Sequence, residues 1–144
     1  MIRNKFWFYF LSFVWNFPMT LVGCVTAIFL LIAGVKPKKW GYCYYFEVGY
    51  DWGGVNLGPI FVTSKNATTH TKSHEHGHAF QGCWFGPLMP FVVSIPSAVR
   101  YWYREIRDLM GNPVRTSYYG VWFESQASAL GKDFIKWYNT QQND

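Results

Sequence analysis

The sequence is short of charged residues and has few histidines and cysteines. Only 15% of its 144 residues are charged, whereas an average soluble domain has about 25%, so the composition indicates association with a membrane. The three cysteines, Cys24, Cys43 and Cys83, form no C-x-x-C pair. This excludes a disulfide framework and leaves only a Cys43–Cys83 bridge open. The net charge of +5 comes from scattered basic residues without a recognition motif, so no nucleic-acid partner is expected.

Charge is entirely absent from residues 6–35, where apolar and aromatic residues predominate. Roughly 20 apolar residues cross the hydrocarbon core as a helix, so we expect a single N-terminal membrane span with a break near Pro18. A cleaved signal peptide is the alternative, but its apolar core is usually only ~7–15 residues long. We therefore predict a membrane anchor in residues 1–40 and a second domain in residues 41–144.

The second domain has the pattern of an α+β fold. Residues 41–63 are rich in aromatic and β-branched residues around an Asp-Trp-Gly-Gly turn, which predicts a β-hairpin. A polar run with candidate N-caps follows and predicts a helix that carries residues 74–82. A last helix is expected over residues 117–139.

Between these helices lie two further segments. Residues 83–99 are apolar but contain three prolines, which leaves a re-entrant segment, a buried crossover and a second membrane span open. Residues 98–110 have the basic and aromatic pattern of an amphipathic helix at a membrane surface.

The stretch His74-Glu75-His76-Gly77-His78 satisfies the pattern H-E-x-x-H. On a helix, positions i and i+4 share one face, so His74 and His78 can bind one ion. Neutral imidazoles suit zinc, and Glu75 lies where a carboxylate can act as a general base. His76 points elsewhere on the helix and is not expected to be a ligand. A histidine-rich, solvated start of a helix is the alternative interpretation.

A catalytic zinc needs a third protein ligand, and no histidine follows His78. The upstream His70, a cysteine or a downstream carboxylate remain as candidates. Glu124 is favoured among the acids because Ala127 and Gly131 follow it on the same helical face and would allow a close helix contact. The downstream carboxylates are Glu105, Asp108, Glu124, Asp133 and Asp144.

Four stretches of the sequence contain the motifs of a known family: GGVNLG, HEHGHAFQ, FGPLMPFVVSIPS and WFESQASALG. Together they resemble the minimal gluzincins, and in particular a group of small bacterial and phage membrane proteins similar to them. The resemblance covers roughly residues 15–135. It implies a zincin-like fold in which zinc is held by His74, His78 and Glu124, with Glu75 catalytic.

The resemblance also implies further roles. Gluzincins usually place an acid four residues after the ligand glutamate, where this chain has Ser128. A serine there can orient a histidine ligand, but more weakly than an acid. Tyr118 and Tyr119 are candidate oxyanion donors, with ordinary aromatic packing as the alternative. The strand near residues 55–62 is expected to border the cleft, where a peptide can add as a further strand.

The function expected from these features is that of a membrane-anchored zinc metallopeptidase, acting on a peptide or protein at the inner membrane of a bacterium and encoded by the bacterium or a phage. A non-catalytic membrane interaction or immunity protein with a structural zinc site is the first alternative, favoured by Ser128. A membrane-surface adaptor without metal is the second.

Overall fold

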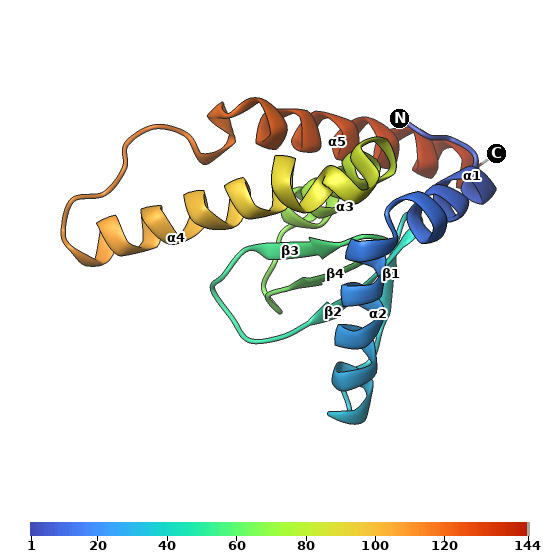
Figure 1. Ribbon diagram of the computed structural model, residues 1–144, viewed down its shortest axis with the longest axis horizontal. Coiled ribbons are helices and arrows are strands. Elements are labelled where there is room, and N and C mark those ends of the chain that lie inside the picture. Colours follow the sequence, from blue (N-terminus) through green and yellow to red (C-terminus); the bar gives the residue numbers. More distant parts are fainter. Residues whose placement is uncertain (144) are drawn as a thin grey trace.

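The computed structural model describes residues 1–143, which form five α-helices and a four-stranded sheet (Figure 1). The predicted mixed α+β class is confirmed. The sheet has the order β1-β2-β4-β3, so β3 is an edge strand. Its strands are β1 (Lys38–Trp40), β2 (Cys43–Glu47), β3 (Gly54–Leu57) and β4 (Ile60–Thr63).

The predicted hairpin of residues 41–63 is wrong in its pairing. Strand β1 pairs antiparallel with β2, and β3 pairs antiparallel with β4, whereas β2 and β4 run parallel. The chain reverses at Gly58, whose φ of +79° suits glycine. The Asn56 side chain supports this turn because it donates to the Gly58 carbonyl and accepts from the Gly58 N–H. The Gly53-Gly54 pair instead leads into β3.

The N-terminal apolar segment is bent rather than straight. Helix α1 (Lys5–Phe10) continues as a π-helix, η1 (Leu11–Trp15), and meets α2 (Phe17–Ile32) at an angle of 95°. Of the helices in residues 1–143, none alone is both long and apolar enough to cross a membrane. Two bent pairs reach that length and composition together, Lys5–Trp15 with Phe17–Ile32 and Thr69–Leu88 with Pro90–Leu109. The predicted single N-terminal span is therefore not supported.

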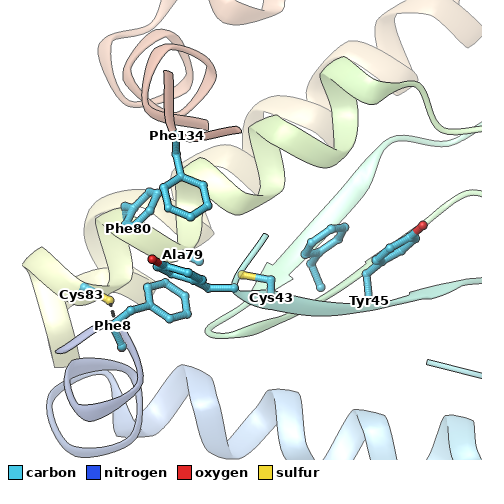
Figure 2. Close-up of a cluster of buried hydrophobic side chains, with 9 residues drawn as sticks. Phe8, Cys43, Tyr45, Ala79, Phe80, Cys83 and Phe134 are labelled. Atoms are coloured by element: carbon cyan, nitrogen blue, oxygen red, sulfur yellow. Dashed lines mark hydrogen bonds between the residues drawn. The ribbon is translucent and has the colours of Figure 1, made fainter. Parts of the chain in front are cut away.

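Helix α3 (Thr69–Phe85) lies at the centre of the molecule, in contact with the sheet and with α5 (Trp122–Asn143) (Figure 1). Thr68 caps its start, because the Thr68 hydroxyl accepts from the Thr71 N–H. Figure 2 shows the main core, where side chains from the N-terminal helix, β2, α3 and α5 meet. Cys43 and Cys83 lie in this cluster as free thiols, so the bridge left open above is not formed.

Residues 83–99 complete the end of α3 and then turn. Two short helical segments, η2 (Gly86–Leu88) and η3 (Pro90–Ser94), lead into α4 (Ile95–Leu109). Pro87, Pro90 and Pro96 each lie in the first turn of one of these segments, where a missing N–H costs no hydrogen bond. Helix α4 extends away from the sheet, and a long loop with the 3-10 turn η4 (Tyr118–Gly120) returns the chain to α5 (Figure 1).

Candidate metal centre

Three buried side chains converge between α3 and α5. His74 and His78 lie one turn apart on α3, and Glu124 lies in the first turn of α5. Their ligand atoms form a tight triangle: Nε2 of His74 lies 3.1 Å from Nε2 of His78 and 3.0 Å from Oε2 of Glu124. The third side, from His78 Nε2 to Glu124 Oε2, measures 3.4 Å. This buried group can hold a metal ion.

Small residues bring the two helices close enough for this convergence. A β-carbon at Gly77 of α3 would overlap the carbonyl oxygen of Ala127, and one at Gly131 of α5 would overlap that of Ser73. The predicted close contact at Ala127 and Gly131 is therefore confirmed. This close contact between α3 and α5 brings the carboxylate of Glu124 within reach of His74 and His78.

The rotation and protonation of His78 are set by Gln81. The Gln81 amide nitrogen donates to the carbonyl of Phe123 at 2.8 Å and to Oε1 of Gln126 at 2.9 Å, which leaves its oxygen facing His78. That oxygen lies 2.8 Å from Nδ1 of His78. Because an amide oxygen only accepts, Nδ1 carries a proton, and in the neutral ring Nε2 therefore presents its lone pair to the triangle.

Ser128 lies beside the ring of His74, as Gln81 lies beside the ring of His78. Its hydroxyl oxygen lies 2.8 Å from Nδ1 of His74, so it can accept a hydrogen bond from Nδ1–H and leave Nε2 of the neutral ring free. Histidines that bind metals usually donate their other ring N–H to such a partner. The structure thus places Ser128 where the resemblance implies an orienting group.

Glu124 is oriented by a residue that the sequence did not reveal. The Ser97 hydroxyl donates to Oε1 at 2.5 Å and is in turn bonded to the Tyr118 hydroxyl at 3.0 Å. Oε2 is buried and has no partner of hydrogen-bond geometry among residues 1–143. Burial alone would raise the pKa of Glu124, but in the metal-free site hydrogen bonds from the His74 and His78 rings, when their Nε2 atoms carry a proton, and from Ser97 hold this pKa well below its usual range. An ionised carboxylate oxygen therefore faces two imidazole nitrogens.

This arrangement fits a tetrahedral ion. Ligands at about 2.0–2.1 Å from zinc lie roughly 3.3 Å from one another in a tetrahedron, close to the three distances observed. Two imidazoles and one carboxylate leave the fourth position open, as in catalytic zinc sites. The donor set and the spacing thus suit a divalent metal such as zinc.

Glu75 is buried beside this group and under the edge strand. Its side chain packs against Gly54, where a β-carbon would lie only 2.7 Å from Oε1. Its carbonyl oxygen accepts from the Asn56 side chain at 3.0 Å, which ties β3 to α3. Burial raises the pKa of Glu75 to about 7, so the carboxylate can exchange a proton near neutral pH.

A cleft of about 480 Å³ opens over Glu75 and the two histidines. Strand β3 forms one wall through Gly54, Val55 and Asn56, and α4 forms the opposite wall. Both predicted tyrosines line the cleft, but they differ. The Tyr118 hydroxyl is bonded to Ser97, while the Tyr119 ring packs against His74 with 5.1 Å between ring centroids.

The remaining candidate residues lie away from the triangle. His76 is fully buried in the core, where its ring stacks on Phe134 at 4.5 Å and its Nε2 accepts from the Tyr42 N–H. Burial lowers the pKa of His76 to about 3, so it stays neutral. His70 is exposed at the start of α3, as are Glu105, Asp108 and Asp133 on their helices. Asp144 lies outside the described residues.

Two orienting residues were missed in the sequence. Gln81 lies three positions after His78 on the same helical face, and this spacing was a usable signal. Ser97 could not be found in this way, because its contact with Glu124 depends on the path of residues 83–99.

Comparison of the chain with family models, curated proteins and solved structures yields no match. The function is therefore inferred from the geometry and chemistry of the site.

Proposed function

We propose that the protein is a membrane-anchored zinc peptidase of the minimal gluzincin type. The observation that carries the proposal is the convergence of two imidazole nitrogens and one unpartnered carboxylate oxygen at the base of a cleft. Histidine, histidine and glutamate are the ligand set of one major class of zinc peptidases. His74, His78 and Glu124 would hold the metal.

The chemistry divides between the metal and the chain. When bound, zinc lowers the pKa of a water molecule and polarises a carbonyl group. Glu75 follows His74 directly on α3 and lines the cleft. Its carboxylate takes the proton of the attacking water and delivers it to the leaving nitrogen. Ser97, Gln81 and Ser128 hold the three ligands in position.

The cleft suits an extended peptide. Strand β3 is an edge strand, so its outer N–H and C=O groups can pair with a substrate strand. Tyr119 is the better candidate for an oxyanion donor, because the Tyr118 hydroxyl is already bonded to Ser97. Both tyrosines line the same cleft as Glu75.

Membrane attachment is assigned to the N-terminal apolar segment. Residues 6–35 contain no charged residue, and their outward side chains are large and apolar. Met19, Gly23 and Ala27 form the buried face of α2, while Leu21, Val25 and Ile28 are exposed. Such a surface matches hydrocarbon better than water, so this bent segment anchors the domain in a bilayer.

Ser128 favours a second candidate, a non-catalytic membrane interaction protein with a structural metal. A serine beside His74 is a weaker partner than the acid found in gluzincins. The two candidates differ in turnover, because a structural site would bind zinc without cleaving peptides.

The test is a comparison of Glu75→Gln with Glu105→Gln. Glu105 also lines the cleft but is exposed, so it is the matched control. Both variants should keep about one zinc, and only Glu75→Gln should lose hydrolysis of a peptide library, by roughly 10²–10⁴-fold. Persistent activity in Glu75→Gln would exclude Glu75 as the base. A zinc-loaded wild type that cleaves no peptide would favour the structural site.

A further inference from the structure

Helix α4 presents three different faces, about 120° apart at 100° per residue. The first face is a wall of the cleft. The second carries arginines whose guanidinium groups donate to main-chain carbonyls in residues 112–118. The third is an apolar stripe, which nothing in residues 1–143 covers. The wall includes Ser97, Ala98 and Tyr101, and the arginines are Arg100, Arg104 and Arg107.

The apolar stripe is continuous and strongly exposed. Its residues recur every three or four positions, the spacing of one helical face. Val99 is 63% exposed and Leu109 is 88% exposed, although both are aliphatic. The stripe consists of Ile95, Val99, Trp102, Ile106 and Leu109, all of which are exposed.

The stripe adjoins a larger apolar surface from two other segments. Phe91 and Leu88 precede it and are also exposed. The N-terminal helices lie next to them, since the Trp15 indole N–H donates to the Trp84 carbonyl and Met19 contacts Ser94. No charged residue occurs in residues 6–35 or 79–99, the two ranges that supply this surface up to Val99.

The composition of this surface favours lipid over protein. Trp102 of the stripe and Trp15 and Trp84 of the adjoining surface are exposed, and tryptophan is enriched at the boundary between hydrocarbon and headgroups. Residues 100–115 carry four arginines against two acids, which complements anionic headgroups. An exposed apolar stripe that contains a tryptophan and adjoins a face of arginines is typical of a helix that lies in a membrane interface.

We infer that α4 lies in the surface of an anionic lipid bilayer, with its apolar stripe immersed. The same helix forms a wall of the cleft, so the cleft lies within about one helix diameter, roughly 10–12 Å, of the lipid. Given the peptidase activity proposed above, the substrate is a peptide segment immediately next to a membrane, such as the flank of a membrane-embedded helix. A freely diffusing peptide is the poorer substrate.

Single cysteine labels test the position of α4. In a Cys24→Ser background, where Cys43 and Cys83 are buried, Val99→Cys and Ile106→Cys place an environment-sensitive fluorophore on the stripe. Asp108→Cys is the matched control on the same helix, because it is exposed but off the stripe. The full chain is reconstituted into phosphatidylglycerol–phosphatidylcholine vesicles with doxyl-labelled lipid. Quenching by lipid should be at least about threefold stronger at Val99 and Ile106 than at Asp108.

Two results would overturn the inference. Equal quenching at all three positions, with full access to aqueous iodide, would show that water covers the stripe. Protection from iodide without quenching by lipid would show that a protein, such as a second copy of the chain, covers it. His74→Ala in the labelled background should leave the quenching unchanged, so failure of the metal site and failure of the membrane contact are separable.

The substrate class has its own test. A peptide tethered to vesicles by a lipid should be cleaved with a kcat/KM at least about tenfold above that of the free peptide. Val99→Glu should remove this preference and leave cleavage of the free peptide unchanged, because Val99 does not line the cleft. If both peptides are cleaved equally, the assignment of membrane-adjacent substrates fails even where α4 is immersed.

Discussion

Replacement of Gln81 by methionine should weaken metal binding without removing any ligand. Gln81 is fully buried and makes three hydrogen bonds of 2.8–2.9 Å, to His78, Phe123 and Gln126. Methionine has a similar volume, but its thioether is only a weak acceptor for the Nδ1–H of His78, so the ring loses its fixed orientation. Loss of such a partner costs about 10–100-fold in metal affinity, which is ~1.4–2.8 kcal/mol.

The same substitution also affects folding, and a second variant separates the two effects. Three lost hydrogen bonds at about 1 kcal/mol each would lower stability by ~3 kcal/mol. Gln81→Glu keeps an acceptor for His78 but cannot donate to the Phe123 carbonyl. It should therefore lose stability while retaining zinc affinity, since a carboxylate is a strong partner for a histidine ligand.

The assay is a zinc dissociation constant measured by competition with a chromogenic chelator, with circular dichroism to establish the folded fraction. Gln126→Ala is the control, because the Phe123 carbonyl still holds the Gln81 amide in place. Its affinity should stay within about threefold of the wild type. Unchanged affinity in Gln81→Met, or an equal loss in Gln81→Glu, would refute the role assigned to Gln81.

Substitutions at three further positions test the residues that pack around or orient the candidate metal ligands. Gly77→Ala places a β-carbon against the Ala127 carbonyl and should destabilise the protein by about 3 kcal/mol; an unchanged melting temperature would contradict the tight helix contact. His76→Ala should lower the melting temperature through a cavity that costs about 3 kcal/mol, yet zinc content should persist in the folded fraction, unlike in His74→Ala. Ser128→Ala should lower zinc affinity by about tenfold and Ser128→Asp should raise it; the same chelator competition measures both, and the opposite order would exclude orientation of His74 by Ser128.

Local features of the sequence paired His74 with His78 and favoured Glu124 among several candidates for the third member of the group. The i, i+4 spacing of His74 and His78 fixes their common face once a helix forms. Ala127 and Gly131 marked the face of α5 that packs closely, and this placed Glu124 near them. These predictions depend on periodicity and side-chain size, which a sequence shows directly.

Features that depend on contacts distant in the sequence were not predicted. Asn56 stabilises a turn between β3 and β4, and β4 pairs parallel with β2, whereas the Gly53-Gly54 pair gave the stronger turn signal. The 95° bend before α2 allows its small residues to pack on the sheet, which hydropathy alone does not reveal. Ser97 reaches Glu124 only because the chain bends by 117° between Thr69–Leu88 and Pro90–Leu109.

X-ray absorption at the zinc edge of the purified full-length protein tests the metal centre most directly. The account predicts about one zinc per chain, with nitrogen and oxygen ligands at about 2.0–2.1 Å and the imidazole scattering of two histidines. Glu124→Ala should remove one oxygen ligand and lower the zinc content. Zinc bound through sulfur, or a folded wild type that retains no metal, would contradict a centre formed by His74, His78 and Glu124.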